Sequence, residues 1–405
     1  MRSRFFLHAA AGAAVILTLT FFGCASDGSS NEDSGTPPGA ADPQELFEPG
    51  PYDVGFREFP ITYDAAGDGG EREILLRVWY PADLGSDAPP ARYQVGGIVD
   101  LPAQLALDSP PITEDGDLPF VVHSHGNGGE GLTSYPYGEL MASHGWIHVA
   151  PNHTGNTALD FLGTPDPTTR SSLDRPTDIT AIIDAFESGL DGDPLAGKAV
   201  TSEVFVYGHS FGGYTTFAKA GASIDVDRQL EACEGSDSAG CEVTKTPENE
   251  EAFREGFLDP RVVALAPQAP AIGSFEEEAL SGLGIPVMLM TGRLDQTTTQ
   301  ETSAIPSWNQ LDGESDIWVE MPEGGHFSFI TICYDLEKAI RDIFQPDADE
   351  DGCGPEFVNA EEAIPVLTAY VLAFGRRHVL DETQWDDVLE GPPLGNDGDF
   401  VISLK

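Results

Sequence analysis

The stretch Gly208-His209-Ser210-Phe211-Gly212 has the pattern G-x-S-x-G and lies between two segments of different character. The apolar run Val204-Phe205-Val206-Tyr207 before it predicts a buried strand, and residues 214–222 after it predict a helix. A strand–turn–helix of this kind bends sharply and holds the serine hydroxyl above the edge of the sheet. The helix also directs the positive end of its dipole at that hydroxyl. The stretch therefore predicts an α/β fold in which Ser210 is a nucleophile.

Strand and helix patterns alternate along the chain from residue 55 onward. Apolar runs predict strands at residues 56–63, 74–80, 120–123, 146–150, 204–207, 262–266, 287–290 and 317–321. Helical patterns lie at residues 137–143, 177–188, 214–222, 303–310 and 361–375. The first two strands are expected to form an antiparallel pair. The rest of the alternation predicts a doubly wound, mostly parallel sheet with helices on both faces.

Two acidic segments, residues 225–258 and 345–357, do not fit the alternation. The first contains a pair of cysteines and little strand pattern. It is expected to be an insertion at the carboxyl end of the sheet, and the sequence leaves open whether it moves as a lid.

Asp295 and His326, which lie later in the chain than Ser210, complete a candidate catalytic set. A serine hydroxyl becomes a strong nucleophile when a base accepts its proton and an acid orients that base, and in this arrangement they follow in the order serine, acid, histidine. Asp295 comes just past the strand 287–290, and His326 just past the strand 317–321. Because the carboxyl ends of parallel strands share one edge, these side chains are expected to meet. The set predicts a serine hydrolase with Ser210 as nucleophile, His326 as base and Asp295 as acid.

The backbone amides of Phe211 and Asn127 are the candidate oxyanion hole, which stabilises the negative oxygen of an acyl-transfer intermediate. Phe211 directly follows the nucleophile. Asn127 lies in the glycine-rich turn Ser124-His125-Gly126-Asn127-Gly128-Gly129, after the strand 120–123. Since the elbow places Phe211 beside the serine, its ring is also expected to line the substrate cleft.

His125-Gly126 in the glycine-rich turn, Gly-His-Ser-Phe-Gly-Gly at residues 208–213 and Val78-Trp79-Tyr80-Pro81 carry a family resemblance. At these motifs the chain resembles bacterial predicted dienelactone hydrolases and platelet-activating-factor acetylhydrolase-like serine esterases of the α/β-hydrolase superfamily. The resemblance covers about residues 52–380. It implies an α/β-hydrolase fold and hydrolysis of short-chain carboxylic esters without a metal or organic cofactor. Bacterial polyester hydrolases and cutinases place their acid as Asp295 is placed here, so a polymeric ester is a second expected substrate.

Two alternatives to ester hydrolysis stay open at this stage. The same triad could act on a thioester, a lactone or an amide, because every acyl transfer uses the same parts. A fold does not determine function, so the chain could also be a non-catalytic surface-binding protein on a hydrolase scaffold.

The charge balance excludes one class of partner. The chain has 68 acidic residues against 20 lysines and arginines, a formal net charge of -48. Binding to a phosphate backbone needs clustered basic residues, so nucleic acid is not an expected partner. The expected partner is a small-molecule or polymeric ester.

The N-terminus has the features of an export signal. Arg2 and Arg4 precede the apolar residues 9–22, and the segment ends Phe21-Phe22-Gly23-Cys24, which resembles a bacterial lipobox. This predicts a lipoprotein-type signal peptide over residues 1–23 and a lipid on Cys24. The protein would then be anchored to the bacterial outer membrane or cell surface. An ordinary secretory signal peptide, giving a secreted protein, is the alternative.

Composition divides the remainder of the chain. Residues 24–48 are rich in Gly, Ser, Pro, Asp and Glu and predict a flexible acidic tether. Residues 49–405 are the predicted catalytic domain. Four cysteines other than Cys24 allow three pairings, and proximity along the chain favours Cys233–Cys241 and Cys333–Cys353.

Two segments have partial metal-binding patterns. His123 and His125 share one face of a strand, but no carboxylate pattern nearby completes a catalytic zinc set, so no metal is expected there. Asp347, Asp349 and Asp351, followed by a glycine, match the first half of a calcium loop, although Val358 stands where the loop would end in glutamate. A structural calcium ion and a solvated acidic turn are both open interpretations of this segment.

Overall fold

The computed structural model of this chain describes residues 41–188, 190 and 192–405. The predicted signal peptide, Cys24 and most of the predicted tether lie outside the described residues. Nearly all of the predicted catalytic domain lies within them. In these described ranges, no helix combines the length and apolar character needed to cross a bilayer.

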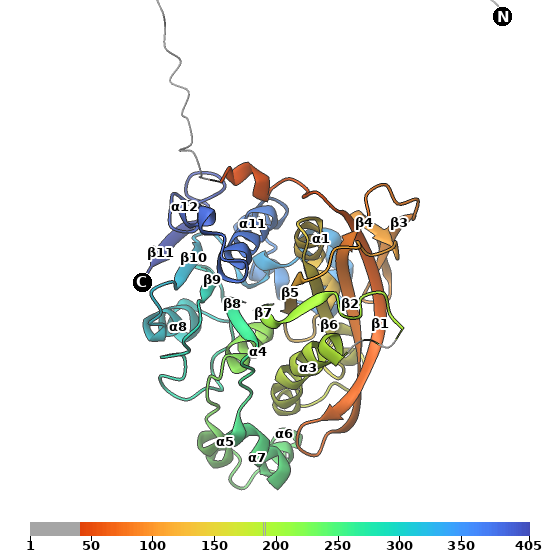
Figure 1. The fold of residues 1–405 in the computed structure, drawn as a ribbon. Coiled ribbons are helices and arrows are strands. Elements are labelled where there is room, and N and C mark those ends of the chain that lie inside the picture. The colour runs from red at the N-terminus through yellow and green to blue at the C-terminus, as the bar shows by residue number, and fades with distance from the viewer. Residues whose placement is uncertain (1–40, 189, 191) are drawn as a thin grey trace, which may run out of the picture. The chain divides into compact units, whose positions relative to one another are not determined.

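The described residues form a mixed sheet of 11 strands with the order β11-β10-β9-β8-β7-β5-β6-β2-β1-β4-β3, which runs from left to right in Figure 1. Its centre consists of six neighbouring parallel strands. Their bounds are β5 Leu118–Ser124, β6 Ile147–Asn152, β7 Ala199–His209, β8 Val262–Gln268, β9 Met288–Gly292 and β10 Ile317–Met321. The parallel core therefore matches the alternation of strands and helices in the sequence.

The two flanks of the sheet are largely antiparallel, although β1 and β4 pair in parallel, so the expected mostly parallel, doubly wound sheet is confirmed only in part. The flanking strands are β1 Asp53–Ala65, β2 Gly70–Ala82, β3 Pro90–Val95, β4 Val99–Asp108 and β11 Val401–Leu404. The antiparallel pair β1–β2 was expected, but β3, β4 and β11 were not. Each of these three strands is short or half exposed, so its sequence lacks a continuous apolar run.

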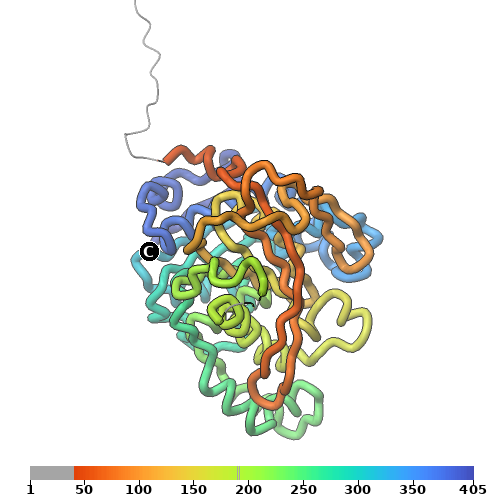
Figure 2. The backbone as a smooth tube through the Cα atoms, turned by 45° about the vertical axis from the view of Figure 1, so that its right-hand side comes forward, coloured from red at the N-terminus to blue at the C-terminus, as the bar shows by residue number. Residues whose placement is uncertain are grey.

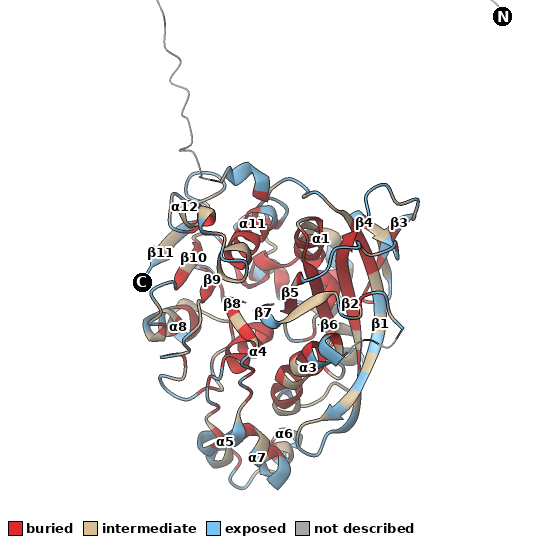
Figure 3. Ribbon diagram, viewed as in Figure 1, coloured by how far each residue is buried: buried red, intermediate tan, exposed pale blue. Residues whose placement is uncertain are grey.

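Helices cover both faces of the parallel strands. On one face α1 (Tyr135–Ser143) and α11 (Ala360–His378) pack against Val121 and Phe205. On the other, α3 (Thr168–Ser188) and α4 (Phe211–Lys219) pack against neighbouring residues of the same strands. Successive residues of a strand point to opposite faces, so each central strand supplies both cores. Figure 3 shows these strands buried between the helices.

The remaining helices are short: α2 Ala158–Phe161, α5 Val226–Ala232, α6 Ala239–Lys245, α7 Pro247–Glu255, α8 Ile305–Gln310, α9 Ile332–Asp335, α10 Lys338–Phe344 and α12 Asp386–Leu389. Helix α3 begins earlier than its sequence pattern predicts and contains Pro176. The buried face of its first half, which includes Arg175, is largely polar, and this hides the helical period from the sequence.

The acidic segment 225–258 folds into the three helices α5, α6 and α7. The Cys233–Cys241 disulfide joins the end of α5 to α6, as proximity along the chain predicted. The segment packs against α3 and against the turn of the β1–β2 hairpin, where Asn249 Oδ1 accepts a hydrogen bond of 3.0 Å from Asp68 N. Figure 2 shows these green helices beside the orange-red tip of the hairpin.

Candidate active site

Ser210 occupies the sharp turn between β7 and α4. Its backbone has φ 57° and ψ -111°, a conformation that a residue with a side chain rarely adopts. A Cβ atom on Gly212 would lie 1.8 Å from the Ser124 carbonyl oxygen, and one on Gly208 would lie 2.7 Å from the Gly212 backbone. The two glycines of the motif are therefore required by close backbone approach.

The structure brings Ser210, His326 and Asp295 together. His326 Nδ1 lies 2.9 Å from Asp295 Oδ2, and His326 Nε2 lies 2.8 Å from Ser210 Oγ. Because a carboxylate only accepts hydrogen bonds, Nδ1 donates to Asp295, which leaves Nε2 to accept from the serine hydroxyl. The base is thus oriented toward the hydroxyl whose proton it would take.

The surroundings of Asp295 keep its carboxylate ionised. Burial raises the pKa of Asp295, but hydrogen bonds from His326 and Thr298 outweigh that effect, and its pKa lies below the ordinary value. Thr297 N and Thr298 N donate to Oδ1 at 2.8 and 2.7 Å, and Thr298 Oγ1 donates to Oδ2 at 2.8 Å. These donors also orient the carboxylate toward the histidine.

Asp351 connects the loops that carry the acid and the base, a role that its pattern as a candidate calcium ligand did not suggest. Its side chain is 4% exposed. Asp351 Oδ1 accepts hydrogen bonds from His326 N at 3.0 Å and Gln296 N at 2.9 Å, and Oδ2 accepts one from Thr297 Oγ1 at 2.7 Å. One carboxylate therefore holds the His326 backbone and the residues after Asp295 in a shared position.

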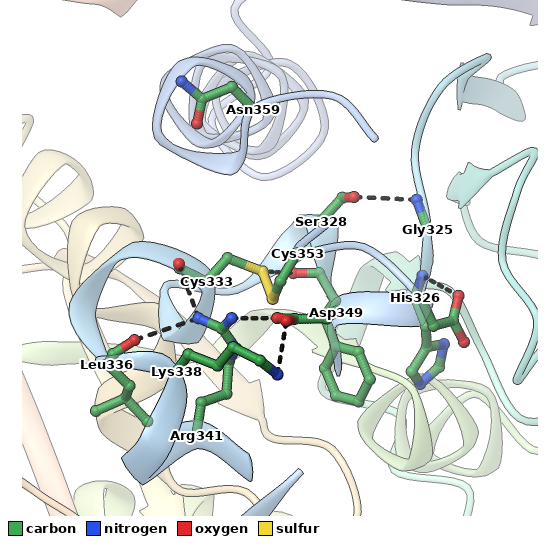
Figure 4. Close-up of a disulfide and its surroundings, with 12 residues drawn as sticks. Gly325, His326, Ser328, Cys333, Leu336, Lys338, Arg341, Asp349, Cys353 and Asn359 are labelled. Carbon is green, nitrogen blue, oxygen red and sulfur yellow. Dashed lines mark hydrogen bonds and ion pairs between the residues drawn. A yellow bond between two sulfur atoms is a disulfide. The ribbon is translucent and has the colours of Figure 1, made fainter. Parts of the chain in front are cut away.

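The second expected disulfide, Cys333–Cys353, closes the chain two residues beyond Asp351. Figure 4 shows it beside Arg341 and Asp349, with His326 on the other side. Asp349 forms ion pairs with Arg341 and with Lys338, the latter at 2.7 Å. Two of the three carboxylates of the candidate calcium loop thus have protein partners. In the described part of the chain, no three His, Cys, Asp or Glu side chains are arranged to hold a metal ion.

Arg175 holds the turn that contains Asn127, another role absent from the sequence interpretation. This fully buried side chain donates hydrogen bonds to the carbonyl oxygens of His125 and Gly126. Its guanidinium carbon also lies 4.5 Å from the centre of the Phe211 ring. One arginine therefore contacts both segments that supply the candidate oxyanion amides.

A second Ser-His-Asp arrangement lies beneath this turn. His153 Nε2 is 2.8 Å from Ser124 Oγ, and His153 Nδ1 is 2.7 Å from Asp178 Oδ2. All three residues are buried, and burial lowers the pKa of His153 so that its imidazole is neutral. None of the three lines the pocket above Ser210. Both sets are buried and their distances are alike, but only the first opens onto a pocket, which Ser210 and His326 line.

The pocket above Ser210 has a volume of about 180 Å³. Gly126 and Asn127 lie on one side, His326 and Phe327 on another, and residues 345–347 contribute a further wall. No residue of the segment 225–258 lines it, so the second acidic loop, and not the first, borders the site. The ring of Phe211 is also absent from the lining: it is packed in the core against Arg175 and Tyr214, contrary to its predicted contact with substrate.

Comparison with known proteins defines the fold and no more. No protein-family model matches the chain, and no curated protein matches it. The solved ferulic acid esterase from Streptomyces cinnamoneus is similar in structure, with a TM-score of 0.59 over 87% of this chain and 96% of that chain. The two sequences are 21% identical, so the likeness extends to the fold alone. The mixed sheet and its helices are compatible with the α/β-hydrolase fold, while the more specific family resemblance stays a prediction.

Proposed function

We propose that this protein is a serine hydrolase that cleaves carboxylic esters. The observation that carries the proposal is the continuous hydrogen-bonded chain from Ser210 Oγ through His326 to Asp295, with contacts of 2.8 and 2.9 Å. The chain ends at a serine held in a strained turn beneath an open pocket. This is the geometry that activates a hydroxyl for acyl transfer.

In the proposed reaction, Ser210 Oγ attacks the ester carbonyl carbon while His326 Nε2 accepts the hydroxyl proton. Asp295 orients the imidazole and stabilises its positive charge. The backbone amides of Phe211 and Asn127 donate hydrogen bonds to the carbonyl oxygen as it becomes negative. His326 then returns the proton to the leaving alcohol. Water releases the acyl group from the serine by the same steps and restores the enzyme.

Two features support the assignment of the oxyanion amides. Phe211 is the first residue of α4, and the first N–H groups of a helix have no partner within it. Asn127 borders the pocket, and Arg175 holds the carbonyl oxygen of the residue before it. Removing one such donor typically costs about 3 kcal/mol of transition-state stabilisation.

The proposed setting is outside the cytoplasm. The signal-like residues 1–23 and Cys24 support export and lipid anchoring, with a tether after Cys24. The predicted start of the catalytic domain at residue 49 is too late, because Pro43–Leu46 form a 3-10 helix whose Leu46 is buried in the core. The two disulfides agree with an oxidising compartment. The proposed substrates are small-molecule or polymeric esters. The similar structure is that of a ferulic acid esterase, which adds aromatic acyl esters to the substrates to be tested.

Labelling with a fluorophosphonate probe, followed by peptide mapping, tests the proposal. The chain offers an internal control, because Ser124 bonds to a histidine that bonds to an aspartate, as Ser210 does, but Ser124 does not line the pocket. The adduct is expected on the peptide that contains Ser210. No adduct, or an adduct on Ser124, would contradict the proposal. Turnover of matched ester, thioester, lactone and amide substrates then identifies the bond, and labelling without turnover of any of them would contradict ester hydrolysis.

Replacing Asp351 is expected to lower kcat with little effect on KM. In Asp351→Ala, the donors His326 N, Gln296 N and Thr297 Oγ1 lose their acceptor, and the base shifts relative to Ser210. A shift of the imidazole by about 1 Å is expected to lower the rate by about 100-fold. Asp351→Asn keeps an oxygen for both amides, and its NH2 group can donate to the threonine hydroxyl. It is therefore expected to stay within about threefold of wild type.

Steady-state kinetics of both Asp351 variants check this expectation. Thermal unfolding is measured in parallel, because uncompensated buried donors also destabilise the fold by about 1–3 kcal/mol each. Equal losses of kcat in the alanine and asparagine variants would show that the hydrogen bonds are not what matters at this position.

A further inference from the structure

A second pocket lies beside the one above Ser210, and its free surface is apolar. Its walls come from the β3–β4 turn, the start of α2 and the segment containing α9 and α10, and include Val95, Val99, Ala158, Ile332, Leu336 and Phe344. The two pockets share Gly129, Thr133, Ile330 and Gln345 as common lining. A molecule bound over Ser210 can therefore extend into the second pocket.

The charged groups in this second pocket are engaged by the protein. Glu130 Oε1 accepts a hydrogen bond from Gly96 N, and Glu130 Oε2 pairs with Arg77. Arg341 pairs with Asp349 and donates to the carbonyl oxygens of Cys333 and Leu336 at 3.1 and 3.2 Å. What the pocket offers to a ligand is hydrocarbon, which favours an apolar group over an anion.

Exposed apolar side chains surround the same region. Ile98 lies in the β3–β4 turn and is 62% exposed, and Leu159 on α2 is 54% exposed next to the position of Gly97. Phe161 lies over Gly128, and Ile343 adjoins Phe344 on α10, both also exposed. Exposed apolar groups gathered at one site mark a surface that meets apolar material.

The position of His326 indicates which part of an ester enters the pocket. The leaving alcohol takes its proton from His326 Nε2, so the alcohol must lie on the His326 side of Ser210. The second pocket is lined by neither His326 nor Phe327, and it lies along the glycine-rich turn at Gly128 and Gly129. The second pocket is therefore assigned to the acyl group of the ester.

We propose that this pocket is the acyl-binding site and that the enzyme prefers short apolar acyl groups that extend beyond acetyl. This inference rests on the proposed ester hydrolysis. The space in the pocket is about 40 Å³, and a water-sized group needs roughly 10–15 Å³, so about three or four carbon atoms fit. Butyryl to hexanoyl esters are the expected substrates, and chains that exceed this space are expected to react more slowly.

The test compares p-nitrophenyl acetate, butyrate, hexanoate and dodecanoate in wild type and in pocket variants. Each buried methylene contributes roughly fourfold in kcat/KM, so wild type is expected to prefer butyrate to acetate by on the order of tenfold. Ala158→Phe fills the pocket and is expected to abolish this preference while acetate turnover stays within about threefold. Leu162→Phe is the matched control, since Leu162 is the exposed residue at the C-terminal end of α2 and does not line the pocket. Its acyl profile should equal that of wild type.

A second variant guards against a local folding defect in α2. Val99→Phe fills the pocket from the β4 side and should produce the same loss of preference. Three outcomes would overturn the assignment: unchanged acyl profiles in both filled variants, equal losses on all esters including acetate, or a changed preference among acetate esters of different alcohols instead. Absence of wild-type turnover and of fluorophosphonate labelling would instead contradict the proposed function itself.

Discussion

Replacing Ser210 by alanine is expected to lower kcat for p-nitrophenyl acetate by about 10⁵- to 10⁶-fold. The change removes the only atom that would form the acyl-enzyme, so water must attack the carbonyl directly. The residual rate would come from the oxyanion amides and substrate binding alone. No other single substitution at this site is expected to have a larger effect.

Burst and steady-state kinetics measure the Ser210 effect, and circular dichroism with thermal unfolding establishes that the fold is intact. The substitution removes the Ser210 Oγ atom and its hydrogen bond with His326, but it removes no packed core group. The variant should therefore unfold near the wild-type temperature. Turnover above about one hundredth of wild type in a folded Ser210→Ala protein would exclude Ser210 as the nucleophile.

Asp295→Asn is expected to lower kcat by about 10⁴-fold. The carboxylate accepts the Nδ1 proton of His326 at 2.9 Å and so selects the tautomer whose Nε2 faces Ser210. An asparagine can present an NH2 group at the same position, which selects the opposite tautomer and leaves Nε2 unable to accept the serine proton. The hydrogen bonds that lower the pKa of Asp295 in the wild type also show that its charged form is the one the fold stabilises.

The matched control for Asp295 is Asp347→Asn. Asp347 borders the same pocket and carries the same charge, but it is exposed and makes no contact with His326. Its replacement is expected to change kcat by less than about threefold. If both variants lost activity equally, the loss would arise from the net charge of the pocket and not from the orientation of the imidazole.

Part of the site could be predicted because its signals are local. Ser210, Asp295 and His326 each follow an apolar strand by a few residues, and the two glycines around Ser210 mark a turn that tolerates no Cβ atom. Parallel strands bring such strand ends to one edge, so the order along the chain was enough to expect their meeting. The distances of 2.8 and 2.9 Å agree with that expectation, and their catalytic roles await the substitutions above.

Other parts were missed because their signals are not local. Asp351 was considered only as a calcium ligand, yet it bonds to residues of two other loops. Arg175 lies 50 residues from His125, whose carbonyl oxygen it holds. The ring of Phe211 was predicted to line the cleft, but it packs in the core, where it contacts the buried guanidinium of Arg175. Short sequence patterns contain no information about such pairings, since each depends on where separate loops are brought by the sheet.

By itself, the sequence determined the parallel core, the sharp turn at Ser210 and the order of the three candidate catalytic residues. These follow from backbone sterics and from apolar runs that must be buried, which act over a few residues. Only the tertiary structure decided that β3 and β4 extend the sheet, that the loop 345–347 borders the pocket above Ser210, and that a second, apolar pocket adjoins it. Those features arise from contacts between segments that are distant in the chain. Half-exposed strands and loops are positioned by the surfaces they pack against, and the local sequence does not specify those surfaces.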